Sequence, residues 1–367
     1  MTTYEIDATG LLRAPVMQQL GRDTAALAGE PGGRFAFAGQ GAWTVYGGGT
    51  REGSDLTVAA YGADPNGALS ERFDVTVVPA PPSACSGCVD DARWLWLKAG
   101  AGRIHGFWRR HWGTAGHRLT YSYVSIPLSS DGAPGRASQT EFPPDRDPGE
   151  VTVDVLSDIL YKAGSYSGQE VHPRGLEAHV IGPDGTLTQM GWTNLCLGGV
   201  ECHSCTARPL TTARGFHFAI VPTTRRYVCS YQGLRLKPYG AFEFSASVAE
   251  AFVPSSEAEP TLVAMGVPVE AGDASRSELR VFSMGADGDL RLLDGDELPS
   301  APTQLLFHPS GRFLYVIDIA SRLRAYRLDP GGRLELTTSI DRATSLYRPE
   351  GSMAVTLRRI AGGPSEG

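Results

Sequence analysis

The sequence predicts an all-β protein of the β-propeller class, and three observations support this. Alternating apolar strands joined by turns rich in Asp, Pro and Gly recur along the chain, and each such pair is typical of a β-hairpin. The turn glycines recur at intervals of roughly 50 residues, which suits four short strands in each unit. Seven such units can be counted over the 367 residues. We therefore expect a seven-bladed propeller that forms a single domain over residues 1–367.

The hairpins differ in clarity along the chain. The clearest copies cover residues 59–71, 178–190, 280–293 and 325–338. Weaker copies, which we also assign as outer hairpins, cover residues 4–16, 106–122 and 233–246. The last clear copy extends to a complete unit, because "QLLFHP", "FLYVID", "LRAYRLD" and "RLELTT" follow one another with short turns between them. This unit is the expected sixth blade.

Two of the predicted strands carry specific packing predictions. Phe313, Tyr315 and Ile317 alternate along one strand and are expected to share a face. Trp94 and Trp96 alternate in the same way, so we expect both to face one side and to pack between blades.

The two ends of the chain each supply half of a unit. Residues 4–16 form only an outer hairpin, whereas "TSLYRPE" and "SMAVTLRR" near the C-terminus are similar to the missing inner strands. We expect the seventh blade to combine about residues 1–20 with residues 340–360, so that no blade keeps an open inner edge. The longest irregular segment, residues 129–150, is expected to be a loop between blades.

Composition and charge narrow the classes of function. The chain has 33 Lys and Arg against 40 Asp and Glu, with a net charge of -7 and no concentrated basic segment, so no nucleic-acid partner is expected. No stretch has the length of a membrane span, and the first residues lack the pattern of a secretory signal, so we expect a cytoplasmic protein without a membrane partner. HExxH and a phosphate-binding glycine loop before a helix do not occur, and GxSxG occurs only as "GPSEG" at residues 363–367, so seryl hydrolase and kinase chemistry are disfavoured.

Six cysteines include two Cys-x-x-Cys pairs that each precede a predicted innermost strand. "CSGC" holds Cys85 and Cys88 before "RWLWLKAG", and "CHSC" holds Cys202 and Cys205 before "GFHFAIVP". If both strands begin beside the central channel on one face, the four thiolates can bind one zinc ion tetrahedrally. Two local disulfides, a redox pair and unrelated thiols remain as alternatives.

The other two cysteines and a histidine complete this group. Cys229, in "RRYVCSY", is most simply a small buried apolar residue, whereas Cys196, in "NLCLGGVE", could replace a metal ligand. If one ligand is missing, the ion becomes a Lewis acid and His203 a general acid or base beside it. A histidine held by backbone hydrogen bonds in a tight loop is the open alternative for His203.

Several segments carry a family resemblance. "ILYKAGSYSGQEVHPRGLEAHVIGPDGTL", "RFAFAGQGAWTVYGGGTREGSDLTVAAYGADPNGAL" and "FHPSGRFLYVID" resemble strands of the seven-bladed lactonase propeller family. This family includes 6-phosphogluconolactonase-like proteins and the fungal carboxymuconate-cyclising enzymes. The resemblance implies an active site on one face near the channel, built from His, Arg and Glu rather than from a seryl nucleophile.

The resemblance also implies roles for individual residues. His203, at the start of the fourth blade, and Glu270, just after the second strand of the fifth blade, match the family's histidine and acidic residue by position. The family's Arg-His pair at the start of the fifth blade has no counterpart, because this chain reads "SEAEPTLVAM" there. Arg174 and Arg208 could bind a substrate carboxylate, with a surface salt bridge as the alternative for each.

We therefore expect a small-molecule enzyme of lactonase or cyclase type. It would open or close the ring of a carboxylated or lactone-like substrate by acid/base catalysis at the channel mouth, with or without help from a metal. The alternative is a non-catalytic propeller scaffold or binding module in which a four-cysteine metal site is purely structural.

Overall fold

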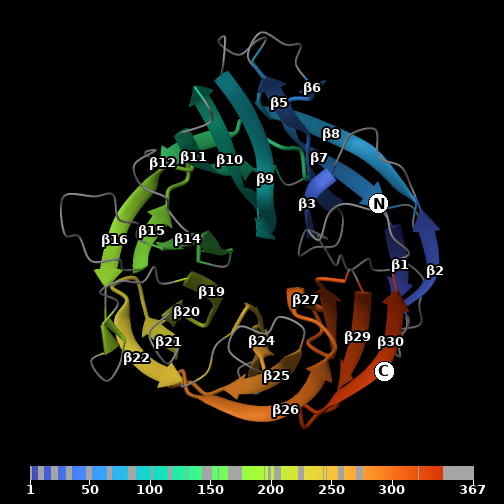
Figure 1. The fold of residues 1–367 in the computed structure, drawn as a ribbon, viewed down its shortest axis with the longest axis vertical. Helices are drawn as coiled ribbons and strands as arrows, with labels where there is room; N and C mark the ends of the chain where they lie inside the picture. The colour runs from blue at the N-terminus through green and yellow to red at the C-terminus, as the bar shows by residue number, and fades with distance from the viewer. Residues whose placement is uncertain are drawn as a thin grey trace.

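The computed structural model confirms an all-β propeller, with antiparallel sheets arranged in a ring (Figure 1). The structure describes residues 2–6, 12–17, 24–29, 35–46, 52–63, 68–81, 88–100, 102–114, 118–129, 131–142, 151–155, 157–163, 176–193, 195–196, 200–201, 208–221, 227–242, 244, 246–254, 260–269, 276–320 and 322–341. No helix in this part of the chain is long and apolar enough to cross a membrane.

Five four-stranded sheets and one six-stranded sheet form six blades, and the strands of each blade follow one another from the innermost to the outermost. The first blade contains β3 (Thr24–Gly29), β4 (Phe35–Gln40), β7 (Leu56–Ala63) and β8 (Leu69–Val78). The second contains β9 (Cys88–Gly100), β10 (Arg103–Thr114), β11 (Arg118–Pro127) and β12 (Ser138–Phe142), extended at β9 by β5 (Ala42–Tyr46) and β6 (Glu52–Gly53). The third contains β13 (Val151–Asp154), β14 (Ile159–Ala163), β15 (Leu176–Ile181) and β16 (Leu187–Thr193).

The remaining blades follow the same order. The fourth contains β19 (Arg208–Ala213), β20 (Phe216–Val221), β21 (Tyr227–Gln232) and β22 (Lys237–Phe242). The fifth contains β23 (Val248–Phe252), β24 (Thr261–Pro268), β25 (Ser277–Met284) and β26 (Leu290–Leu298). The sixth contains β27 (Pro302–Phe307), β28 (Phe313–Asp318), β29 (Arg322–Leu328) and β30 (Leu334–Asp341). Two small hairpins lie outside these blades, β1 (Thr2–Ile6) with β2 (Leu12–Met17) and β17 (Leu195–Cys196) with β18 (Val200–Glu201).

The described residues form six blades rather than the seven that the sequence predicts. The N-terminal hairpin is present as a separate two-stranded sheet beside the sixth blade (Figure 1). Leu12 packs there against the sixth-blade cluster that contains Phe313, Tyr315 and Ile317. The inner strands expected between residues 344 and 359 lie outside the described residues, so the closure of a seventh blade stays a prediction.

The four clearest hairpins are confirmed as the third and fourth strands of their blades. Three of their turns require glycine, since Gly185, Gly288 and Gly332 have φ angles of 82°, 79° and 81°. Each of these three glycines also lies against the preceding blade. A Cβ atom on Gly288 would lie 2.3 Å from Phe216, and one on Gly332 would lie 2.3 Å from Leu293. The turn glycines therefore permit both the backbone conformation and the close packing.

The second blade corrects two predictions. The hairpin at residues 106–122 is formed by β10 and β11, the second and third strands, and is not an outer hairpin. The outer strand is instead β12, which lies inside the segment 129–150 that is expected from the sequence to be a loop. The pattern of this strand is weak because it has five residues, "SQTEF", of which only the last is buried and apolar.

A β-bulge corrects the prediction for the two tryptophans. Trp108 pairs with Trp94 and Phe107 pairs with Trp96, so Leu95 is the extra residue on β9. The bulge places the two indoles in different clusters. Trp94 packs with Trp43 and Trp108 between the first and second blades, whereas Trp96 packs against the cluster between the second and third blades. Both indoles pack between blades as expected, but not on one face.

A buried charged group lies between the second and third blades. Lys162 Nζ is 2.8 Å and His179 Nε2 is 3.0 Å from the same oxygen, Oε2 of Glu177. The ammonium group of Lys162 also lies 5.6 Å from the centre of the Phe142 ring, which belongs to the second blade. Burial alone would raise the pKa of Glu177, but the hydrogen bond from His179 and the charge of Lys162 outweigh it and hold this pKa below 4.5.

We expect Glu177→Gln to lower the free energy of unfolding at pH 7 by about 2 kcal/mol, because Lys162 loses its buried counter-charge. A carboxylate with a lowered folded-state pKa stabilises the fold above its unfolded pKa and loses this contribution as the pH falls through the folded value. The difference between parent and variant should therefore shrink below pH 4.5. Urea unfolding at pH 7, 5, 4 and 3 measures it, and an equal difference at pH 7 and pH 3 would contradict the assignment.

Candidate functional site

The four predicted catalytic residues are only partly within the described chain. His203, Glu270 and Arg174 lie outside the described residues. The backbone of Arg208 begins β19 and pairs with Ile220 of β20. Their convergence therefore stays a prediction, and the flanking strands provide the available geometry.

Those flanking strands attach all three segments to one face of the ring. Arg208 begins the first strand of the fourth blade, Pro268 ends the second strand of the fifth, and Leu176 begins the third strand of the third. In an antiparallel blade, the first strand begins, the second ends and the third begins at the same edge of the sheet. The segments that hold Arg174, His203 and Glu270 are therefore attached to the third, fourth and fifth blades on the same side of the ring.

The Cys-x-x-Cys pairs lie mostly outside the described part of the chain. Cys85, Cys202 and Cys205 are not described, while the backbone of Cys88 begins β9 and pairs with Thr114. The described residues contain no cluster of three or more metal-binding side chains. The zinc site thus stays a prediction.

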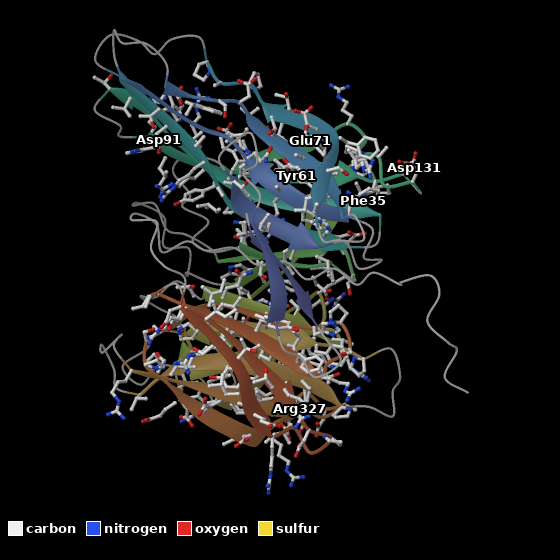
Figure 2. All side chains as sticks on the ribbon, turned by 90° about the vertical axis from the view of Figure 1, so that its right-hand side faces the viewer. Phe35, Tyr61, Glu71, Asp91, Asp131 and Arg327 are labelled. Atoms are coloured by element: carbon white, nitrogen blue, oxygen red, sulfur yellow. The ribbon has the colours of Figure 1, made fainter. Side chains whose placement is uncertain are left out.

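The start of β9 differs from the simple entry to an innermost strand that the sequence predicts. Here β9 belongs to a projecting part of the sheet in which Val89–Arg93 pair with β5 on one edge and with β10 on the other. Trp43 Nε1 donates to Asp90 Oδ1 at 3.0 Å across this sheet, and Arg110 binds both oxygens of the same carboxylate. Figure 2 shows Asp91 and Asp131 on opposite sides of the molecule, which places this projection on one face of the ring. The strand that Cys88 begins is therefore hydrogen-bonded on both edges from its second residue on.

The inner strands bring together charged residues that were not among the predicted site residues. Lys98 lies on β9, and its Nζ donates to Oγ1 of Thr152 on β13, the innermost strand of the next blade, at 3.3 Å. Glu250 lies on β23, the innermost strand of the fifth blade. Burial raises the pKa of Glu250 above its ordinary value of 4.5, while the positive charge of Lys98 opposes part of this rise. A cation and a carboxyl group with a raised pKa thus lie on innermost strands of the ring.

His217 adds a neutral imidazole close to this group. Its side chain is 1% exposed and stacks on Tyr161, with ring centres 4.1 Å apart. Burial lowers the pKa of His217 to about 3, and the charge of Lys98 adds to the effect. Neither ring nitrogen has a hydrogen-bond partner among the described residues. The imidazole is therefore uncharged at neutral pH and keeps its hydrogen-bonding capacity unused in this part of the chain.

A sequence signal for these residues exists. Lys98 stands in "WLWLKAG" and Glu250 in "VAEAF", each a single charge within an apolar run that forms an innermost strand. A charge in such a run has to face either the axis of the ring or a neighbouring blade. The pattern could have been found once the innermost strands were assigned.

Comparisons with known proteins identify the fold. No family model matches the chain, and no curated protein matches it. A Bacteroides fragilis protein, provisionally assigned as a 6-phosphogluconolactonase, superimposes with a TM-score of 0.55 at 14% identity, covering 91% of this chain and 88% of that one. A Lactobacillus plantarum protein gives a TM-score of 0.53 at 12% identity and 91% and 89% coverage. The propeller domain of Cps50 (Swd1) from Myceliophteria thermophila gives 0.52 at 10% identity and 87% and 86% coverage. At these identities, the comparisons support the propeller fold alone.

Proposed function

We propose that the protein is a small-molecule enzyme of lactonase or cyclase type that opens or closes the ring of a carboxylated or lactone-like substrate. The supporting observation is that the segments holding Arg174, His203 and Glu270 are attached to three consecutive blades on one face. Lys98 and Glu250 add charged groups on the inner wall, the innermost strands of the ring. A face with acid, base and cationic groups suits acid/base chemistry on an anionic substrate.

The proposed reaction assigns a role to each group. In ring opening, His203 or Glu270 removes a proton from water as the water oxygen bonds to the lactone carbonyl carbon. The carbon to ring-oxygen bond then breaks, and the protonated partner returns the proton to that oxygen. Ring closure is the reverse. Arg174 and Arg208 hold the substrate carboxylate, and Lys98 adds positive charge along the inner wall.

Two further features belong to this proposal. A seventh blade, completed by residues 340–360 against the N-terminal hairpin, would close the ring around the site. A zinc ion held by Cys85, Cys88, Cys202 and Cys205 would brace the second and fourth blades, and with an open position it would supply Lewis-acid chemistry. The alternative function, a non-catalytic scaffold, needs neither His203 nor Lys98 for binding.

The proposal predicts turnover of carboxylated lactones that depends on His203. We expect His203→Ala to lower kcat/KM by about 10²-fold to 10⁴-fold, the usual contribution of a general acid or base. The assay follows proton release from a panel of lactones with and without a carboxylate on rings of equal size. Glu335→Gln is the matched control and should leave turnover unchanged, because Glu335 lies on the exposed outer strand β30, where it pairs with Arg327 of β29.

A second variant tests the inner wall separately. Lys98→Met removes a charge while keeping a long side chain, so KM should rise for the carboxylated lactones and stay unchanged for the neutral ones. Absence of turnover across the panel, or parent-like kinetics of His203→Ala, would reject the enzyme and favour the scaffold.

A further inference from the structure

Cys229 departs from the sequence expectation in its chemical state. It lies in the middle of β21 in the fourth blade and its side chain is 0% exposed, so the expectation of burial is confirmed. It is not a free thiol, however, because it is disulfide-bonded. A second cysteine must therefore lie beside β21.

The backbone arrangement points to one partner. A disulfide requires Cα atoms roughly 4.4 to 6.8 Å apart. The short strand β17 lies against both β21 and β22, and its second residue is Cys196. The remaining cysteine with a described backbone is Cys88, which begins β9 in the second blade, two blades away.

We propose that Cys196 and Cys229 form a disulfide that ties the segment 194–207 to the fourth blade. This segment contains β17 and β18 and leads directly into β19, the innermost strand. The bond would hold the entry to that strand against the outer half of its own blade.

The chemistry of formation is an exchange with a small-molecule disulfide such as oxidised glutathione. One protein thiolate attacks the small disulfide, and one small thiol leaves. The second protein thiolate then attacks the protein sulfur of the mixed disulfide, and the second small thiol leaves. The two cysteines together lose two electrons and two protons, which the oxidant takes up. Because Cys229 is buried in the folded protein, reductants should reach the bond slowly.

The disulfide divides the six cysteines into one bonded pair and four that remain available as thiols. With Cys196 and Cys229 assigned to the disulfide, the other four are Cys85, Cys88, Cys202 and Cys205, which form the two Cys-x-x-Cys pairs. Cys196 is then no longer a candidate to replace a metal ligand. The disulfide would also help to hold His203, which follows Cys196 by seven residues. A catalytic effect of the disulfide through His203 rests on the proposed function.

The first test counts thiols in protein purified without reductant and unfolded with a chelator present. We expect four titratable thiols before reduction and all six after it. Digestion without reduction should give one cross-linked peptide pair that contains Cys196 and Cys229. Six titratable thiols before reduction, or Cys229 linked to Cys202 or Cys205, would overturn the proposal.

Variants keep the test independent of activity. Cys196→Ser and Cys229→Ala should each leave five titratable thiols before reduction, since each frees the other partner. Cys88→Ser is the matched control, and it should leave three titratable thiols with the cross-linked peptides intact. Amide hydrogen exchange of residues 195–201 should be faster in Cys196→Ser than in the parent protein. Equal exchange in the variant and the parent would reject the anchoring role, whatever the catalytic assays show.

Discussion

Replacing Asp318 with Ala is expected to lower the free energy of unfolding by about 3 kcal/mol, because it breaks a buried ion pair and a turn at once. Asp318 is the last residue of β28, and its side chain is 1% exposed. Its Oδ1 accepts hydrogen bonds from the backbone N–H groups of Ala320 and Arg322 at 2.9 and 3.0 Å. Its Oδ2 accepts one from Nε of Arg322 at 2.9 Å, and Nη2 of the same guanidinium donates to Ser300 at 2.9 Å.

The control for this variant uses an exposed ion pair in the same blade. Glu335, on the outer strand β30, pairs with Arg327 of β29, and both side chains are largely exposed. Glu335→Ala should therefore change the free energy of unfolding by less than about 0.5 kcal/mol. Figure 2 shows Arg327 on the outside of this blade. Asp318→Asn should fall between the two, because the amide keeps the backbone contacts but faces Arg322 with a second donor. Urea unfolding monitored by tryptophan fluorescence measures all three. Equal losses for Asp318→Ala and Glu335→Ala would refute the argument.

The sixth blade shows which features of the fold could be predicted from the local sequence pattern. All four of its strands are recognisable because each is a run of strand-forming residues bounded by a short polar turn, and Phe313, Tyr315 and Ile317 do lie together in one cluster. Such features depend only on neighbouring residues.

The second blade shows what this pattern lacks. The pairing of β5 with β9 joins residues 42–46 to residues 89–93, and no local periodicity encodes such a contact. The bulge at Leu95 reverses the face of every later side chain on β9, so a strict alternation from Trp94 gives the wrong side for Trp96.

The candidate site also combines locally encoded features with tertiary ones. The strand ends that flank its segments could be predicted, because the repeat locates the strands that Arg208 begins and Pro268 ends. The contact between Lys98 and Thr152 joins two blades, and the state of Cys229 depends on a partner outside its own strand. These features require the tertiary arrangement, since the apolar run around Lys98 marks the charge but not its partner, and nothing in the strand around Cys229 marks a disulfide.

We expect Gly288→Ala, at the turn of the fifth-blade hairpin, to lower the free energy of unfolding by about 3 kcal/mol. Gly288 has a φ of 79°, which costs an L-residue about 1 to 2 kcal/mol. An added Cβ would also lie 2.3 Å from Cε1 of Phe216, a buried ring of the fourth blade, so the packing between blades has to shift. Overpacking of this kind costs about 1 to 3 kcal/mol.

Gly215→Ala separates these two costs, because Gly215 has a φ of 77° and nothing within 4 Å of an added Cβ. We expect it to lose only the backbone contribution, about 1 kcal/mol. Phe216→Leu removes the ring atoms nearest to Gly288, so adding Gly288→Ala to that variant should cost little more than Gly215→Ala does. Urea unfolding of the four variants and the parent completes this cycle. If Gly288→Ala and Gly215→Ala lose equal stability, the turn does not press on the neighbouring blade, and the close packing between the fourth and fifth blades is not what selects glycine there.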